Sequence, residues 1–324
     1  MVLPQVFVDR ANSLSRAGKS FLFLIDFEMQ QPKIWLPDQI DSSELLFSIN
    51  GITNAPASSF IDKKLSLHVQ PINESEYRTR FDEVMQQLQY GNTFLTNLTV
   101  KSRIQINTTL RDLFFQVQAS YRCWYRDRFL FFSPESFVKI RDGKIYSYPM
   151  KGTIDANIPD AATVILNDGK EKAEHVTIVD LLRNDLSRVA RNVEVLRFRY
   201  LDKISTNRNK IFQVSSEISG NVLPKYKKLI GSLLLELLPA GSVSGAPKEK
   251  TTRIIKEVEQ EPRGYYTGVF GYFDGNNLDS CVNIRFVEQH NDSLYYRSGG
   301  GITARSNWKR EYEEVIQKIY VPIV

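Results

Sequence analysis

A glutamate and a lysine flank a predicted β-hairpin and could carry out acid–base and covalent chemistry together. The hairpin covers residues 137–148, "FVKIRDGKIYSY", in which Asp142-Gly143 favours a tight turn. Glu135 precedes the hairpin and Lys151 follows it, so the two strands would bring these side chains together. A carboxylic acid and a lysine so placed can serve as proton donor and nucleophile. The same spacing also suits a structural salt bridge, and both interpretations stay open at this point.

To act as a nucleophile, Lys151 must lose a proton near neutral pH. A free lysine has a pKa of about 10.4 and is almost fully protonated under those conditions. Burial beside the apolar Met150 would disfavour the ammonium form, so we expect the pKa of Lys151 to be lowered. The alternative is an ordinary solvated lysine in a loop.

Two pairs of glutamates, each with a spacing of three residues, lie on two predicted helices. Glu171 and Glu174 form the first pair, and Glu311 and Glu314 form the second. Residues three apart share a helix face, so each pair directs its carboxylates the same way. If the pairs faced each other, their oxygens would suit a hard divalent cation such as Mg²⁺. Taken singly, each pair also fits a solvated helix face, and Glu314 could form an ion pair with Lys318.

Two stretches rich in small residues could let the backbone approach a ligand. The first is "PAGSVSGAPKEKT", residues 239–251, in which Pro247 is placed to begin a helix whose free N–H groups attract anions. It is not a phosphate-binding P-loop, because Gly245 is followed by Ala-Pro-Lys. The second is "SGGGI", residues 298–302, which could equally be a turn or bulge at a strand end. Arg285 could bind a carboxylate through two nitrogens or lie on a strand surface.

The elements that must position these residues indicate an α+β protein. Groups of antiparallel strands alternate with long helices, which favours helix-covered sheets over a doubly wound parallel sheet. Residues 155–168 are predicted to be a loop, and residues 268–302 an antiparallel meander. The other predicted elements are two strands with a turn at 21–36, a helix at 75–91, a strand at 94–106, and helices at 170–190 and 307–320, the last opened by Ser306 or Asn307. The helix at 170–190 has an apolar side formed by Val176, Val179, Leu182, Leu186 and Val189.

The composition excludes several classes of protein. The 324 residues carry a net charge of +5, scattered along the chain, without a basic stripe or a nucleic-acid-reading motif. No apolar run reaches the ~20 residues of a membrane helix, and the N-terminus lacks the pattern of a secretory signal. Cys123 and Cys281 have no pairing or metal-binding spacing. We therefore expect a cytoplasmic protein with no nucleic-acid or membrane partner.

Together these stretches resemble the chorismate-utilising enzymes, which include anthranilate, aminodeoxychorismate, isochorismate and salicylate synthases. The resemblance implies two antiparallel β-sheets packed face to face, with helices outside and a cleft for chorismate and Mg²⁺. It extends over residues 75–324, the expected catalytic domain, whereas residues 1–74 match poorly and are expected to add strands to the same globule. The matching stretches are "SPESF", "PMKGT", "KEKAEHVTIVDLLRNDLSRV", "PAGSVSGAPKEKT", "RGYYTGVFGYFDG", "LDSCVNIR", "SGGGITARS" and "EYEEVIQK".

The resemblance also implies a role for each site residue. Glu135 would be the general acid that assists loss of the 4-hydroxyl of chorismate. The direct Mg²⁺ ligands would be Glu174 and Glu314, with Glu171 and Glu311 acting through water. The enolpyruvyl carboxylate would be bound by Arg285, Tyr266 and the backbone of Gly299 and Gly301. The ring and its carboxylate would be lined by Gly152, Thr153, Ser242 and Lys318.

Lys151 distinguishes the branches of this family. The aminodeoxychorismate branch carries lysine at this position, whereas the other branches usually carry alanine. The resemblance therefore implies that Lys151 attacks C2 of chorismate as the 4-hydroxyl leaves, after which ammonia adds at C4. Leu95 stands where isochorismate and salicylate synthases carry a lysine that activates water, and where relatives usually carry glutamine. Gln213 replaces a usual histidine and cannot carry a proton.

The preferred prediction is thus an aminodeoxychorismate synthase that makes 4-amino-4-deoxychorismate for p-aminobenzoate and folate synthesis. Because neither cysteine lies in a nucleophile-elbow context, ammonia is expected from a separate glutamine amidotransferase subunit. The first alternative is anthranilate synthase component I. The second is a catalytically inactive binding protein, which should have lost some of the residues assigned to chemistry, yet all are present.

Overall fold

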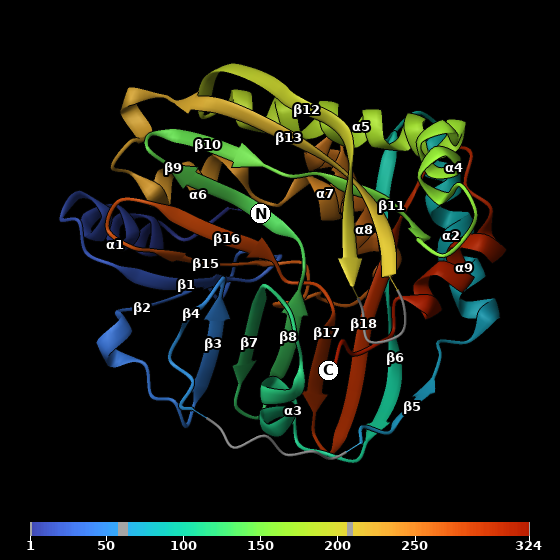
Figure 1. Ribbon diagram of the computed structural model, residues 1–324, viewed down its shortest axis with the longest axis horizontal. Coiled ribbons are helices and arrows are strands. Elements are labelled where there is room, and N and C mark those ends of the chain that lie inside the picture. Colours follow the sequence, from blue (N-terminus) through green and yellow to red (C-terminus); the bar gives the residue numbers. More distant parts are fainter. Residues whose placement is uncertain (1, 58–63, 206–209, 324) are drawn as a thin grey trace.

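Two antiparallel sheets make up the centre of the protein (Figure 1). The computed structural model describes residues 2–57, 64–205 and 210–323, and in these each sheet has nine strands. The first sheet runs β11-β13-β10-β9-β16-β15-β1-β2, with β12 beside β13. The second runs β14-β6-β18-β17-β8-β7-β3-β4, with β5 beside β6.

The strands of the first sheet are β1 (Phe21–Ile25), β2 (Lys33–Trp35), β9 (Ser136–Arg141), β10 (Lys144–Ser147), β11 (Met150–Asp155), β12 (Ala190–Ser205), β13 (Lys210–Val222), β15 (Val269–Phe273) and β16 (Leu278–Val282). Those of the second are β3 (Leu45–Ile49), β4 (Ile52–Thr53), β5 (Leu67–Gln70), β6 (Leu95–Ile106), β7 (Tyr121–Tyr125), β8 (Phe129–Ser133), β14 (Gly245–Ala246), β17 (Phe286–His290) and β18 (Ser293–Ile302). The helices are α1 (Gln5–Arg16), α2 (Glu74–Gln89), α3 (Leu110–Gln116), α4 (Ala161–Asn167), α5 (Gly169–Ser187), α6 (Ile230–Leu237), α7 (Gly241–Ser244), α8 (Lys248–Glu259) and α9 (Trp308–Gln317), with 3₁₀ turns η1 (Pro37–Gln39) and η2 (Pro224–Tyr226).

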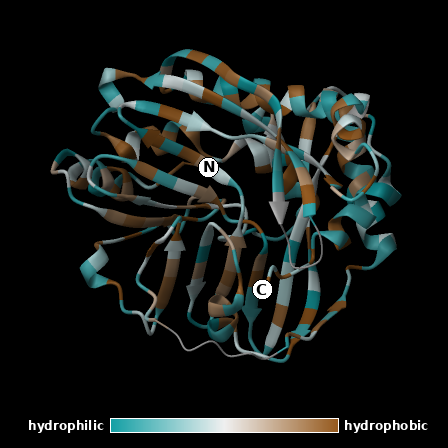
Figure 2. Ribbon diagram, viewed as in Figure 1, coloured by the Kyte–Doolittle hydropathy of each residue, from teal (hydrophilic) through white to brown (hydrophobic). Residues whose placement is uncertain are grey.

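Apolar residues on both faces of the sheets explain this layered arrangement. Strand β1, "FLFLI", is buried at every position, because Leu22 and Leu24 pack against the second sheet while Phe21 and Phe23 pack under α1 and α6. Helices α2, α8 and α9 cover the outer side of the second sheet. Figure 2 shows hydrophobic and hydrophilic residues alternating along β12 and β13. The predicted α+β fold, with sheets face to face and helices outside, is confirmed.

Several predicted elements have the expected bounds. The hairpin β9–β10 turns at Asp142-Gly143, both with positive φ. Helix α2 ends just before Gly91, which also has positive φ. Helix α9 begins after Asn307, whose side chain accepts hydrogen bonds from the backbone N–H groups of Lys309 and Arg310.

Other predictions were wrong. Residues 155–168 contain helix α4, and the expected meander at 268–302 is divided, with β15 and β16 in one sheet and β17 and β18 in the other. Val176 is 47% exposed and does not belong to the buried side of α5. Pro247 caps α8 from the position before its first residue. Residues 298–302 lie in the continuous ladder between β18 and β6, without a bulge or turn.

Candidate active site

Two crossovers between the sheets carry the predicted acid and the predicted carboxylate-binding arginine. Glu135 lies where the chain passes from β8 to β9, and Arg285 lies where it passes from β16 to β17. The backbone N–H of Val282 donates to the Glu135 carbonyl at 3.1 Å, and that of Phe132 donates to the Arg285 carbonyl at 3.1 Å. The two side chains therefore start from adjacent, hydrogen-bonded segments.

The Glu135 carboxyl is held by a serine from another element. The Ser242 hydroxyl on α7 donates to Glu135 Oε1 at 2.7 Å. Burial raises the pKa of Glu135, although this hydrogen bond and the nearby charges of Arg285 and Lys318 act to lower it. Because the net direction is upward, Glu135 keeps its proton to a higher pH than an ordinary glutamate does. This is the behaviour required of a general acid.

Arg285 presents a buried guanidinium with spare donor capacity. Its Nε is buried and has no hydrogen-bond partner within residues 2–57, 64–205 and 210–323. The guanidinium lies 5.0 Å from the ring centre of Tyr320, a residue that no sequence pattern pointed to. Burial raises the pKa of Tyr266 to about 12, and Arg285 is among the cations that oppose this rise. A buried donor of this kind suits a carboxylate ligand.

The three-glycine stretch of β18 faces helix α9. A Cβ atom on Gly300 would lie 3.7 Å from Glu311 Oε2 and 3.8 Å from both Glu314 Oε1 and Lys318 Nζ. Lys318 Nζ contacts Glu314 Oε1 at 2.7 Å and donates to the Gly299 carbonyl at 2.8 Å. The possible ion pair between Glu314 and Lys318 therefore exists, and it lies against the glycine strand. Burial lowers the pKa of Lys318, although Glu314 opposes this.

Lys151 lies on β11, where it faces the first glutamate pair on α5. Its Nζ contacts Glu174 Oε2 at 2.9 Å, with the two side chains 25% and 14% exposed. A Cβ atom on the neighbouring Gly152 would lie 3.0 Å from Glu171 Oε2. Helix α5 begins at this point because the Asp168 side chain caps it by accepting from the Glu171 N–H.

The expectation of a lowered pKa for Lys151 was wrong for this arrangement. Burial does lower the pKa of Lys151, but Glu174, Glu314 and Glu171 outweigh it and the net direction is upward. The apolar neighbour Met150 is visible in the local sequence, whereas the carboxylates come from two helices that lie far away along the chain. Glu174, Glu314 and Glu171 therefore favour the ammonium form of Lys151 in this arrangement.

The donor set fits Mg²⁺ in its chemistry. Two ammonium groups hold these carboxylates here, Lys151 beside Glu174 of α5 and Lys318 beside Glu314 of α9, and they act as stand-in cations. In the part of the chain that the structure describes, no group of three or more His, Cys, Asp and Glu side chains is already arranged to hold a metal ion. A bound cation would thus compete with Lys151 for the same oxygens.

The remaining predicted residues lie at the margin of this group. Thr153 is exposed and pairs with Gln213 across β11 and β13. A Cβ atom on Gly301 would lie 3.1 Å from Leu95 Cδ1, so the residue that replaces the usual glutamine lies against the glycine strand. Sequence reasoning missed Tyr77, whose buried hydroxyl lacks a hydrogen-bond partner among the described residues. Its pKa is raised by burial and by Glu311 and Glu314.

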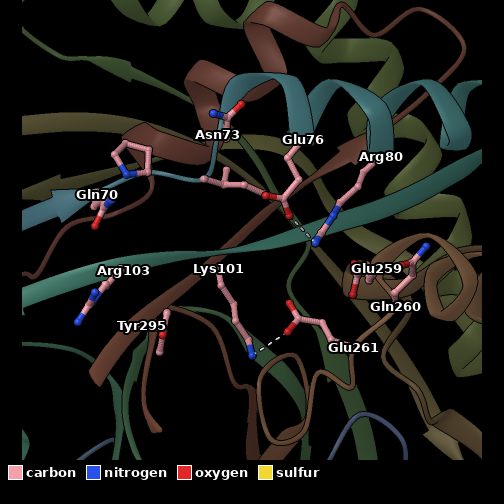
Figure 3. A pocket seen from close by; sticks show the side chains of 12 residues that line it. Gln70, Asn73, Glu76, Arg80, Lys101, Arg103, Glu259, Gln260, Glu261 and Tyr295 are labelled. Carbon is pink, nitrogen blue, oxygen red and sulfur yellow. Dashed lines mark hydrogen bonds and ion pairs between the residues drawn. The ribbon is translucent and has the colours of Figure 1, made fainter. Parts of the chain in front are cut away.

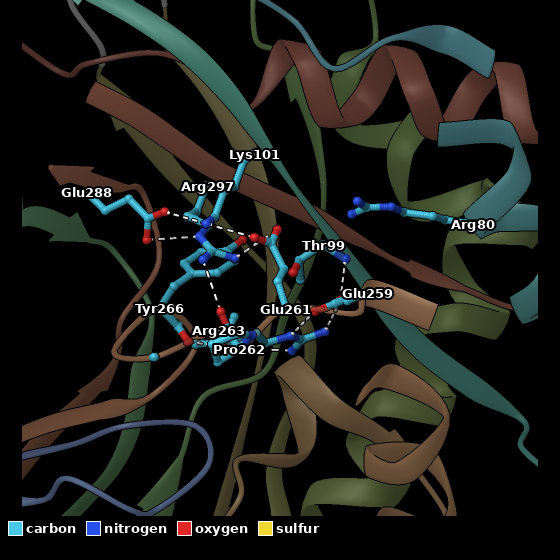
Figure 4. A network of polar contacts seen from close by, with 12 residues as sticks. Arg80, Thr99, Lys101, Glu259, Glu261, Pro262, Arg263, Tyr266, Glu288 and Arg297 are labelled. Atoms are coloured by element: carbon cyan, nitrogen blue, oxygen red, sulfur yellow. Dashed lines mark hydrogen bonds and ion pairs between the residues drawn. The ribbon is translucent and has the colours of Figure 1, made fainter. Parts of the chain in front are cut away.

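Buried ion pairs fix α7, the short helix that carries Ser242. Figure 4 shows Arg263 beside Glu259, whose carboxylate also accepts a hydrogen bond from the Thr99 backbone N–H of β6. Arg263 donates to the Val243 carbonyl at 2.7 Å and contacts Glu259 at 2.7 Å. Lys248, the first residue of α8, contacts Asp185 of α5 at 2.8 Å and donates from Nζ to the Leu237 carbonyl, which precedes α7, at 2.7 Å.

A surface pocket of about 660 Å³ lies between α2, β6 and the end of α8 (Figure 3). Its charged side chains are largely paired with each other: Arg80 contacts Glu76 at 2.8 Å, and Lys101 contacts Glu261 at 2.7 Å. It contains none of the predicted site residues.

The chain matches the family model for chorismate binding enzymes over residues 22–323, and it belongs to that family. It is 51% identical over 318 residues to an uncharacterized PabA-like protein of Pasteurella multocida, a match that covers 98% of each chain. It is 47% identical to an uncharacterized PabA-like protein of Haemophilus influenzae, covering 98% of this chain and 97% of the other. It is also 36% identical over 194 residues to anthranilate synthase component 1 of Mycolicibacterium smegmatis, covering 57% of this chain and 36% of the other.

Solved structures share the fold. Anthranilate synthase component I from Streptococcus pneumoniae superimposes with a TM-score of 0.67 at 28% identity, covering 78% of this chain, which spans 58% of that one. MenF, the menaquinone-specific isochorismate synthase of Escherichia coli, superimposes with a TM-score of 0.73 at 16% identity, covering 97% of this chain and 80% of the other. None of the helices in the described ranges has the length and apolar character needed to cross a membrane.

Proposed function

We propose that this chain is the chorismate-aminating component of an aminodeoxychorismate synthase. It would convert chorismate and ammonia into 4-amino-4-deoxychorismate for p-aminobenzoate and folate synthesis. The observation that carries the proposal is the position of Lys151, which contacts Glu174 at 2.9 Å and lies next to Gly152, itself against Glu171. A solvated loop lysine would not lie among the carboxylates of two helices.

In the first step, Lys151 gives up its ammonium proton to solvent, and its neutral amine bonds to C2 of chorismate while both ring double bonds shift and the C4–O bond breaks. Glu135 gives its proton to the departing oxygen, which leaves as water. The raised pKa of Glu135 supports this role, because the acid must still be protonated near neutral pH. The attached nitrogen then loses its extra proton to solvent.

In the second step, ammonia bonds to C4, both ring double bonds shift back, and the bond between C2 and the lysine nitrogen breaks. The lysine nitrogen takes up a proton and leaves as a free amine, while the new ammonium group at C4 loses one. The nucleophile at C2 divides one difficult substitution into two easier ones. The overall change is replacement of the 4-hydroxyl by an amino group, with release of water.

The other residues would bind the substrate and a cation. Arg285 has a buried Nε without a partner among the described residues, which supports its assignment to the enolpyruvyl carboxylate, together with Tyr266 and the backbone of Gly299 and Gly301. Gly152, Thr153, Ser242 and Lys318 would line the ring. Glu174 and Glu314 would hold Mg²⁺ directly, with Glu171 and Glu311 acting through water, and the ion would neutralise a chorismate carboxylate.

The reaction products test the proposal. The purified chain would be supplied with chorismate, an ammonium salt and Mg²⁺, with and without an aminodeoxychorismate lyase. We expect p-aminobenzoate only when the lyase is present. Fluorescent anthranilate formed without the lyase would contradict the proposal.

The second candidate function is that of anthranilate synthase component I. The local identity to anthranilate synthases favours it, and the residues assigned to Mg²⁺ and to the carboxylates would serve either reaction. Lys151 favours amination, because direct addition of ammonia at C2 needs no lysine nucleophile at that carbon. An isochorismate-type addition of water is disfavoured because Leu95 has no group that could activate water.

A further inference from the structure

Arg263 is a fully buried arginine for which the proposed reaction has no role. It follows the end of α8, and its side chain is 1% exposed. Its Nε and Nη2 donate to the two carboxylate oxygens of Glu259, at 2.9 Å and 2.7 Å. A buried ion pair is often no more stabilising than apolar side chains of similar size. The value of this pair therefore lies in the positions that it fixes.

The other hydrogen bonds of the pair reach the backbone of two further elements. Arg263 Nη1 donates to the Val243 carbonyl of α7 at 2.7 Å, and Nη2 donates to the Asn97 carbonyl of β6 at 2.6 Å. Glu259 accepts from the Thr99 backbone N–H of β6 at 2.8 Å. The planar guanidinium fixes the directions of its donors relative to one another. The pair thus ties α7 to β6.

Helix α7 depends on such support because it is short. It contains only the four residues Gly241–Ser244, so few hydrogen bonds of its own fix its direction. Ser242 directly precedes Val243, and its hydroxyl donates to Glu135 Oε1 at 2.7 Å. The position of the Val243 carbonyl therefore decides whether the neighbouring hydroxyl reaches the carboxyl group.

We propose that Arg263 is a positioning residue, which keeps the Ser242 hydroxyl on the Glu135 carboxyl group. It acts through the Val243 carbonyl and is not itself a catalytic residue. The inference rests on the proposed function only in that Glu135 is taken as the proton donor. The hydrogen bond between Ser242 and Glu135 can be measured without turnover.

The groups that act on the Glu135 carboxyl come from several elements. The hydrogen bond from Ser242 and the charges of Arg285 and Lys318 lower its pKa, while burial raises it. The charge of Glu135 in turn acts on the Cys281 thiol of β16, whose own pKa is raised mainly by burial. Within this set, Ser242 is the residue that lies on α7, the helix that the buried arginine holds. A loosened α7 should therefore raise the pKa of Glu135.

Arg263→Lys tests the inference, because it keeps a positive charge beside Glu259 and loses the fixed fork of donors. The pKa of Glu135 would be read by carbon-13 NMR of protein labelled in its glutamate carboxyl groups, with Glu135→Gln to assign the signal. Loss of a hydrogen bond to a charged carboxylate corresponds to about 1–2 pH units, which is the rise expected in Ser242→Ala. We expect Arg263→Lys to raise the pKa in the same direction, and to cause no further rise when combined with Ser242→Ala.

Arg297→Lys is the matched control. Arg297 is also a buried arginine, 4% exposed, and Figure 4 shows it in the same network of polar contacts. Its contacts are with Glu288, Glu261 and the Pro262 carbonyl. Arg297→Lys should therefore destabilise the protein without changing the pKa of Glu135.

A double variant covers the case in which Arg263→Lys does not fold. Replacing Arg263 and Glu259 together by Met leaves no unpaired buried charge, a change that is often neutral for stability, and it removes the same donor to Val243. The pKa of Glu135 should rise in this variant as well. An unchanged pKa in the folded variant, or a rise that is fully additive with that of Ser242→Ala, would overturn the inference. Neither result depends on which product the chain makes, so a failure of the proposed function would be recognised separately in the product assay.

Discussion

Lys151 is the residue on which the choice between reactions depends. We expect Lys151→Ala to lower the rate of chorismate amination by at least about 100-fold, because the nucleophile at C2 is lost, while chorismate affinity changes only a few-fold. Steady-state kinetics and equilibrium binding would measure the two quantities. Lys144→Ala is the matched control, because Lys144 is an exposed lysine in β10, the strand that precedes β11 along the chain. Equal amination rates in the two alanine variants would contradict this role for Lys151. In a separate experiment without ammonia, the wild-type protein should gain the mass of a dehydrated chorismate on Lys151.

The pair formed by Glu135 and Ser242 predicts a shift in the pH profile. An acid works while protonated, so kcat/KM should fall as the pH rises through the pKa of Glu135. The hydrogen bond from Ser242 lowers that pKa, so Ser242→Ala should raise it further and move the alkaline limb to higher pH. Ser242→Thr, which keeps the hydroxyl, should leave the limb near its wild-type position. A limb that moved to lower pH in the alanine variant would contradict the assignment, whatever the absolute rate.

The same pKa has a consequence for stability. The folded pKa of Glu135 is raised above that of the unfolded chain, so its favourable contribution is fully present below the unfolded pKa and is lost as the pH rises through the folded pKa. Glu135→Gln, which stays neutral, should therefore gain stability relative to the wild type at about pH 8 and gain none at about pH 4. Urea unfolding at the two pH values would measure this difference.

At the scale of elements, the buried pair of Arg263 and Glu259 holds α7 and part of β6. Removing one partner of a buried ion pair costs about 3–5 kcal/mol, and we expect a loss of this size in Arg263→Met, measured by urea unfolding. Arg253 lies on α8, as Glu259 does, but its side chain is 66% exposed. Its ion pair with Glu249 is long, at 3.9 Å. Arg253→Met should therefore change stability by less than about 1 kcal/mol. Similar losses in the two variants would show that the buried network has no special role.

The glycines of β18 should differ in how much an added methyl group destabilises the protein. A Cβ atom on Gly299 would lie 2.6 Å from the Leu98 carbonyl oxygen, whereas one on Gly300 would have its nearest neighbour at 3.7 Å. Gly299→Ala should therefore destabilise the protein by about 1–3 kcal/mol, and Gly300→Ala should cost less than that in the same unfolding experiment. The reverse order would mean that the strand does not lie against β6 as described.

The sequence was informative about long periodic elements and capped ends, and much less so about where neighbouring strands go. Helix α2, strand β6 and the cap at Asn307 could be predicted because their patterns are local. Nothing local in "LDSCVNIRF" indicates that the chain changes sheet at Arg285, because that choice depends on the partners of β16 and β17. The raised pKa of Lys151 was missed for the same reason, since Glu171, Glu174 and Glu314 reach it only through tertiary packing.

For the molecule as a whole, the structure predicts how ammonia is obtained. Both cysteines of the sequence are 0% exposed, and burial raises the pKa of each thiol. Neither is an accessible thiolate of the kind that attacks glutamine. We expect the purified chain to use ammonium salts and not glutamine, and to use glutamine once a glutamine amidotransferase subunit is added. Glutamate release from glutamine by this chain alone would contradict this expectation.

The hydrogen bonds between the two crossovers also bear on how the protein can move. Glu135 and Arg285 each contribute a backbone carbonyl to the bonds that join these segments. A change in the angle between the sheets would therefore displace both side chains together. Glu135 and Arg285, the proposed proton donor and carboxylate-binding residue, would keep their separation while the opening around them widens or narrows. Small changes in the angle between the sheets would then alter how readily chorismate enters and products are released. They would not disturb the alignment of the two side chains that bond breaking requires.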